Sequence, residues 1–229
     1  MDYSFSKGHT MRAAMLWQRW MRCSALLCMA ALALALQGCR EQASAASRFH
    51  SHEVTGASYG RDWRMPDTAG VMRDQSLLQG PVSYVFFGFT QCPEVCPTTM
   101  LELAQVKELL GAEGTHFQAI FVTVDPERDT PEILRAYLDS FDTSAIGLVG
   151  SPEQLSSMAR EFKVFYQKVP LELPATAGSE GAEGSDAYYT MDHSAGGYVY
   201  DRHGKLRLYS PYGAAVEDLA ADVRQLLSE

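Results

Sequence analysis

The sequence predicts an α/β fold in which helices flank a central mixed sheet, with an added hairpin on its N-terminal side. Runs of consecutive apolar residues, typical of strands buried on both faces, alternate with segments whose apolar residues recur at helical spacing. This alternation implies parallel strands joined by right-handed crossovers. A hairpin pattern near the C-terminus adds antiparallel strands and makes the sheet mixed.

The predicted elements follow one another in a simple order. A small hairpin that turns at Gly70 comes first, within residues 61–80. Core strands are expected at residues 81–89, 117–124 and 146–150, with a strand-like segment at 164–169. Helices are expected at residues 98–111, 131–141, 151–162 and 214–227. The late hairpin covers residues 196–210, and residues 171–187, which lack apolar periodicity, are expected to form a long flexible loop.

Composition limits the class of protein. The 229 residues fit one domain with extensions, and a hydrophobic fraction of 46% is enough for a substantial core. The net charge of -9 argues against a nucleic-acid partner, because phosphate binding needs clustered basic residues.

The N-terminal segment has the pattern of a targeting sequence. Basic residues precede an apolar run at 24–36, which is short for a transmembrane helix. The sequence "LQGC" then matches a bacterial lipobox imperfectly, which makes Cys39 the expected lipidated residue. We therefore expect a signal peptide of lipoprotein type at 1–38, a flexible membrane tether at 39–56 and a folded domain at 57–229. An uncleaved membrane anchor is the alternative.

Either form of anchoring places the domain on the extracytoplasmic face of a membrane, where thiols can oxidise. Cys23 and Cys28 would leave with a cleaved signal, and Cys39 would carry lipid. Cys92 and Cys96 would then be the remaining thiols. They follow the first core strand and precede its helix, which is where the reactive cysteines of a thioredoxin-like fold lie.

Each of these two cysteines is followed by a proline, which disfavours helical geometry in the residue before it. We expect Pro97 to be the first helical residue, so that both cysteines lie outside the helix. Cys96 would then sit at the helix N-terminus, where the helix dipole stabilises a thiolate.

The cysteine pair leaves three interpretations open. A structural disulfide closing so small a loop would constrain the unfolded chain very little. A redox dithiol is plausible. A metal clamp is favoured if a third ligand exists, and His193 is the candidate. Thioredoxin-like redox proteins carry a cis-proline in the segment before the last hairpin, whereas this chain has Asp192, His193 and Ser194 there. Two thiolates and one imidazole suit Cu(I), or Cu(II) with an added ligand, better than zinc.

Three separated motifs, "FGFTQCPEVCPTTM", "VDPERDTP" and "MDHSAGGYVYD", together resemble the SCO/SenC family of copper-binding, thioredoxin-like proteins. The resemblance runs from about Trp63 to the C-terminus, and its small departures, such as Gln91 where the family often has histidine, leave the proposed ligands unchanged. It implies one copper ion bound by Cys92, Cys96 and His193. It also implies that Asp125, which matches a family aspartate near the copper site, supports that site.

The resemblance further implies a role in assembling the binuclear copper centre of cytochrome c oxidase. The first hypothesis is a copper chaperone that delivers the ion to the copper-accepting subunit and turns nothing over. The second is a thiol-disulfide reductase that acts on the cysteines of that subunit. A peroxidase ranks last, because the residues around Cys92 offer no activating arginine and threonine arrangement.

Overall fold

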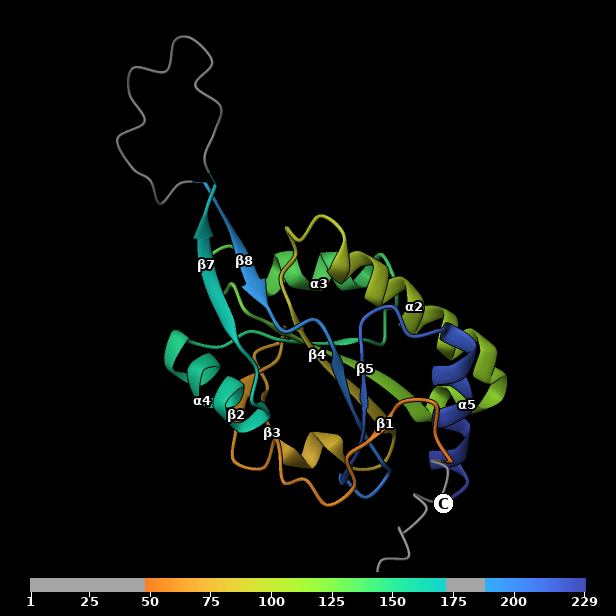
Figure 1. The fold of residues 1–229 in the computed structure, drawn as a ribbon. Coiled ribbons are helices and arrows are strands. Elements are labelled where there is room, and N and C mark those ends of the chain that lie inside the picture. The colour runs from red at the N-terminus through yellow and green to blue at the C-terminus, as the bar shows by residue number, and fades with distance from the viewer. Residues whose placement is uncertain (1–47, 172–187) are drawn as a thin grey trace, which may run out of the picture. The chain divides into compact units, whose positions relative to one another are not determined.

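The computed structural model describes residues 48–171 and 188–229 (Figure 1). The expected signal peptide, the lipidation site at Cys39, residues 39–47 of the expected tether and most of the expected flexible loop lie outside these residues. Among the helices that the structure does describe, none combines the length and apolar character needed to span a bilayer.

A six-stranded mixed sheet forms the centre of the domain. Its strands, in spatial order, are β1 (His52–Glu53), β10 (Leu206–Ser210), β9 (Gly197–Tyr200), β4 (Val82–Gly88), β5 (Phe117–Thr123) and β6 (Ile146–Leu148). Strands β4, β5 and β6 are parallel, whereas β9 runs antiparallel to both β4 and β10. The predicted parallel core strands and the late antiparallel hairpin are both confirmed.

Four α-helices pack on this sheet: α2 (Val95–Leu110), α3 (Pro131–Asp139), α4 (Pro152–Phe162) and α5 (Val216–Leu227). Two 3-10 helices, η1 (Gln75–Leu78) and η2 (Gly111–His116), complete the helical segments among the described residues. The order strand, helix, strand, helix, strand, helix, hairpin, helix is the predicted one, and the thioredoxin-like architecture is confirmed.

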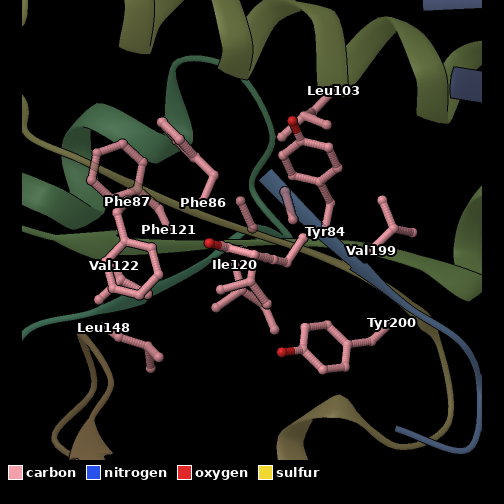
Figure 2. Packing of buried hydrophobic residues seen from close by; sticks show 14 of the residues in the cluster. Tyr84, Phe86, Phe87, Leu103, Ile120, Phe121, Val122, Leu148, Val199 and Tyr200 are labelled. Atoms are coloured by element: carbon pink, nitrogen blue, oxygen red, sulfur yellow. The ribbon is translucent and has the colours of Figure 1, made fainter. Parts of the chain in front are cut away.

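Alternate side chains of β4 face opposite layers of helices (Figure 2). Phe86 packs edge-on against Phe121 at 4.8 Å between ring centroids, and Phe121 in turn contacts Tyr137 of α3. Phe87 points to the other face, where it packs against Phe162 of α4 at 5.3 Å. Both faces of β4 are therefore buried, which explains why its sequence is continuously apolar.

The added N-terminal hairpin is also present. Strand β2 (Arg64–Pro66) pairs antiparallel with β3 (Met72–Asp74), and Gly70 in the turn has a φ of 77°. The buried carboxylate of Asp67 accepts hydrogen bonds from the backbone N–H groups of Ala69 and Val71 and thereby holds the turn closed.

The folded domain begins earlier than residue 57. Phe49 is 5% exposed and belongs to the core, and the backbone N–H groups of His50 and Ser51 each donate to the Asp222 carboxylate at 2.7 Å. Residues 52–53 form β1, which pairs with β10 at the edge of the sheet. The expectation of a flexible tether is therefore wrong for residues 48–56.

Besides the β2–β3 hairpin, another two-stranded sheet projects from the body of the domain (Figure 1). It consists of β7 (Tyr166–Pro170) and β8 (Tyr189–His193), which pair antiparallel and share no ladder with the six-stranded sheet. The sequence predicted β7 and missed β8. The β7–β8 sheet matters for the site because His193 is the last residue of β8.

Candidate metal centre

The cysteine loop leaves the sheet at the end of β4 and enters α2. The helix begins at Val95, two residues before Pro97, so Cys96 lies within its first turn. The expectation that Pro97 begins the helix and that both cysteines lie outside it is therefore wrong for Cys96. A proline is tolerated here because the first N–H groups of a helix have no intrahelical acceptor.

Gly88, the last residue of β4, makes room for the thiol of Cys96. A Cβ atom at Gly88 would lie 2.7 Å from the Cys96 Sγ and 2.9 Å from the Phe86 ring. The Cys96 side chain is completely buried, whereas the Cys92 side chain is partly exposed. Both thiols are free, and the two sulfurs therefore differ in access to solvent.

His193 completes a compact group of three potential ligands. One ligand atom from each of Cys92, Cys96 and His193 lies within 4.8 Å of the other two, and the His193 Nε2 is 3.8 Å from the Cys96 Sγ. The His193 Nδ1 is 3.0 Å from the Ser194 carbonyl oxygen, which can only accept a hydrogen bond. Nδ1 therefore carries the proton, and Nε2 presents its lone pair toward the sulfurs.

The two thiols differ strongly in acidity. The pKa of Cys92 is lowered to about 5, chiefly by a hydrogen bond with the Cys96 side chain. The Cys96 backbone N–H, which donates to the Cys92 sulfur at 3.4 Å, and weaker hydrogen bonds from neighbouring groups add to this effect, and burial opposes it. The pKa of Cys96 is raised. The largest cause is the same side-chain hydrogen bond, and the next is burial of the thiol. The expectation of a stabilised thiolate at Cys96 is therefore wrong, because the helix N-terminus stabilises the sulfur of Cys92 instead.

Asp129 fixes the start of the cysteine loop. Its fully buried carboxylate accepts hydrogen bonds from the Thr90 backbone N–H at 3.0 Å, the Thr90 hydroxyl at 2.6 Å and the Thr123 hydroxyl at 2.6 Å. Burial raises the pKa of the Asp129 carboxyl, and these hydrogen bonds oppose that rise. The bonds tie the loop that carries Cys92 to the loop that follows β5.

Asp125 lies in the same loop but reaches the site indirectly. Its carboxylate is 1% exposed and accepts hydrogen bonds from the Tyr189 hydroxyl at 2.8 Å and from the Arg128 Nε. None of the hydrogen bonds of Asp125 in the described part of the chain is with a cysteine or with His193. Its link to the site runs through Tyr189, which begins the strand that ends at His193.

The structure places the three predicted ligands, Cys92, Cys96 and His193, next to one another. The residues that surround them, Thr90, Arg128 and Asp129, were not singled out from the sequence. A signal for them existed in the sequence. Strands β4 and β5 are parallel neighbours, so the loops after them must meet at the same edge of the sheet. The motif "VDPERDTP" forms the loop after β5, so its polar residues are expected to lie beside the cysteine loop that follows β4.

Comparisons with known proteins agree with this geometry. A protein-family model described as SCO1/SenC matches residues 51–228. The SCO2-like protein of Rickettsia felis is 34% identical over 146 residues, which cover 64% of this chain and 66% of that relative. The match thus spans slightly less than two thirds of the length of that relative.

Solved structures are similar over most of the described domain. The structure of Bradyrhizobium japonicum ScoI with copper bound has a TM-score of 0.63 and 34% identity, covering 73% of this chain and 99% of that one. The solution structure of apo Sco1 from Thermus thermophilus has a TM-score of 0.64 and 34% identity, covering 80% and 99% of the two chains.

Proposed function

The chain belongs to the SCO1/SenC family, and on that premise we propose that it binds copper and delivers it to the copper-accepting subunit of cytochrome c oxidase. The observation that carries the proposal is the convergence of Cys92, Cys96 and His193 within 4.8 Å. The similar Bradyrhizobium japonicum structure has copper bound, which supports the choice of metal.

The donor set fits one Cu(I) ion. Thiolates and a neutral imidazole are soft or borderline ligands, and Cu(I) accepts a low coordination number. Cu(II) would need an added ligand, and a closed zinc site would need a fourth protein ligand. The unprotonated Nε2 of His193, fixed by the bond of Nδ1 to Ser194, is the ring nitrogen that would coordinate.

The burial of the three side chains suits transfer to a partner. Cys96 is buried, whereas Cys92 and His193 are only partly buried, so one side of the group is open to solvent. The ligands of an incoming copper-accepting protein would approach from that open side. The ion would then be released from Cys92 and His193 before Cys96.

Oxidase assembly in cells tests this function. Cells that lack the protein are supplied with wild-type chain or with the His193→Ala variant, and the copper centre of the oxidase is quantified. We expect His193→Ala to lose assembly, and added copper to restore it. Restoration by a thiol reductant, with no response to copper, would contradict delivery.

Thiol-disulfide reduction is a second candidate, favoured by the pKa of about 5 at a partly exposed Cys92 beside a buried Cys96. The Cys92 thiolate would attack a partner disulfide, forming a mixed disulfide and releasing one partner thiolate. Cys96, on losing its proton, would then attack the Cys92 sulfur and release the second. Two electrons pass to the partner, and the chain keeps an intramolecular disulfide. Partner reduction by His193→Ala at the wild-type rate would support this activity.

We also propose that the domain is held at the extracytoplasmic face of a membrane by lipid on Cys39. The support is the basic cluster, apolar run and lipobox-like "LQGC" of the sequence. Cell fractionation tests it: Cys39→Ser is expected to release the protein from membranes. Retention of Cys39→Ser in the membrane fraction would indicate an uncleaved anchor instead.

A further inference from the structure

His193 does not belong to the hydrogen-bonded ladder of the six-stranded sheet. Both cysteines are fixed by β4 and α2, whereas His193 ends β8, which forms ladder bonds with β7 alone. The chain connects His193 to β9 through residues 194–196, and the Ser194 N–H donates to the Phe165 carbonyl. Side-chain contacts between β8 and the cysteine loop then determine how close the imidazole lies to the sulfurs.

Arg128 contacts both strand β8 and the cysteine loop. Its Nη1 donates to the Tyr189 carbonyl of β8 at 2.8 Å and to the Gln91 side-chain oxygen, next to Cys92, at 3.2 Å. Its guanidinium also lies 3.7 Å from the centroid of the Tyr189 ring and 5.8 Å from that of Phe89. One side chain thus touches the strand that carries the histidine and the loop that carries the first cysteine.

Asp125 holds the arginine in this orientation. Its buried carboxylate accepts from the Arg128 Nε and from the Tyr189 hydroxyl, so the same carboxylate binds the arginine and the β8 tyrosine. The Arg128 side chain is 20% exposed, which limits competition from water. The Phe89 ring, which packs under the guanidinium, also contacts the His193 imidazole edge-on at 5.8 Å.

We propose that Arg128 is a positioning residue for the metal centre, which holds strand β8 against the cysteine loop and thereby keeps the His193 imidazole within reach of the two sulfurs. The inference rests on the proposed copper site and adds what assembles it. Arginine suits the role because its planar fork donates in several directions and stacks on an aromatic ring, which a lysine ammonium cannot reproduce.

Copper affinity is the first measurement. Arg128→Met is expected to weaken Cu(I) binding in a chelator competition by roughly 10- to 100-fold, as for other groups that orient a metal ligand. Arg128→Lys, which keeps the charge, is expected to lie between Arg128→Met and wild type. Arg135→Met is the matched control, because Arg135 also donates to a backbone carbonyl, that of Ala145, but lies on α3 away from β8. An equal loss in Arg135→Met would overturn the proposal.

A double-mutant cycle separates positioning from general stability. If Arg128 acts through His193, adding Arg128→Met to His193→Ala causes no further loss of copper affinity. A general loss of stability would weaken binding by the same factor in both backgrounds, and that result would overturn the proposal.

A metal-free measurement keeps this inference separate from the proposed function. In reduced, copper-free protein, the imidazole proton resonances of His193 report its packing against Phe89. We expect these resonances to move toward random-coil positions in Arg128→Met and to stay in place in Arg135→Met. If wild-type protein binds no copper, the proposed function fails while this spectrum still decides the role of Arg128. Unchanged His193 resonances in Arg128→Met would overturn that role.

Discussion

The Nε2 atom of His193 lies 3.8 Å from the Sγ of Cys96, although the two residues are 97 positions apart in the chain. Cys96 is in the first turn of α2, and His193 ends a strand outside the main sheet. The fold thus brings a sulfur at the start of α2 close to an imidazole from a strand outside the main sheet. The consequences for metal binding, packing and acidity can each be measured.

Removal of the His193 imidazole is expected to reduce copper affinity while leaving the redox chemistry of the two cysteines in place. His193→Ala should weaken Cu(I) binding by at least about 100-fold, more than the loss of a group that merely orients a ligand. Titration of the thiols should show that both cysteines still interconvert between dithiol and disulfide. His203→Ala is the control, because His203 is exposed in the turn between β9 and β10. Equal copper affinity in His193→Ala and His203→Ala would exclude the imidazole as a ligand.

A methyl group at Gly88 is expected to disturb the buried thiol. Gly88→Ala places a Cβ 2.7 Å from the Cys96 Sγ and should lower the free energy of unfolding by about 1–3 kcal/mol through overpacking. It should also reduce copper affinity. Gly147→Ala on β6 creates comparable contacts, at 2.8 Å from Thr68 and 2.9 Å from Leu134, away from the cysteines. Denaturant unfolding should therefore report similar losses in both variants, with copper affinity reduced in Gly88→Ala alone.

The acidity of Cys92 predicts a pH dependence of its reactivity. Because the pKa of Cys92 is lowered to about 5, its thiolate is present at neutral pH and is lost only as the pH falls through about 5. The rate of alkylation by iodoacetamide should follow that midpoint. In Cys96→Ala, the side-chain hydrogen bond that lowers this pKa most is gone while the backbone bond remains, so the midpoint should move up from about 5 toward the ordinary value of 9.0. A wild-type midpoint near that ordinary value would contradict this assignment.

Substitution of Asp129 is expected to lower both the free energy of unfolding and the copper affinity. Asp129→Ala leaves the Thr90 N–H and the Thr90 and Thr123 hydroxyls without this acceptor, which should cost about 1–3 kcal/mol of unfolding free energy. Copper affinity should fall as the loop loosens. Asp142→Ala is the control, because Asp142, in the loop after α3, accepts from Ser144 of the same loop and from Lys107 in the last turn of α2, at the opposite end of that helix from Cys96. Copper affinity that stays at the wild-type value in Asp129→Ala would show that the loop is held by other contacts.

Much of the fold could be predicted because burial leaves a clear pattern. Strands β4 and β5 are buried on both faces and are therefore continuously apolar, and the cap residues Thr130 and Ser151 accept hydrogen bonds at the starts of α3 and α4. Strand β8 was missed because its pairing is with β7 alone, so its sequence carries no continuous apolar run. The start of the domain was missed because residues 50 and 51 are held by hydrogen bonds to the Asp222 carboxylate, which is more than 170 positions away in the sequence.

The sequence predicted which three side chains lie together at the site, but it did not predict which of the two thiols has the lower pKa. The prolines after both cysteines suggested a helix that begins at Pro97, but the helix accommodates this proline in its first turn. Cys96 is therefore buried inside the helix start, and its N–H points at the Cys92 sulfur, which reverses the expected order of acidity. The parallel pairing of β4 and β5 places the loop of Arg128 beside the cysteine loop, but the sequence does not show that Arg128 reaches Gln91 and Tyr189, which are 37 and 61 positions away.

X-ray absorption spectroscopy of the reduced, copper-loaded protein tests the copper centre most directly. The spectrum reports the number and type of atoms bound to the metal, and a metal analysis of the same sample gives the copper content per chain. The account predicts one copper ion per chain bound by two sulfurs and one imidazole nitrogen, with the nitrogen lost in His193→Ala. A wild-type spectrum with fewer than two sulfur ligands, or one unchanged by His193→Ala, would contradict the assignment of Cys92, Cys96 and His193 as the copper ligands.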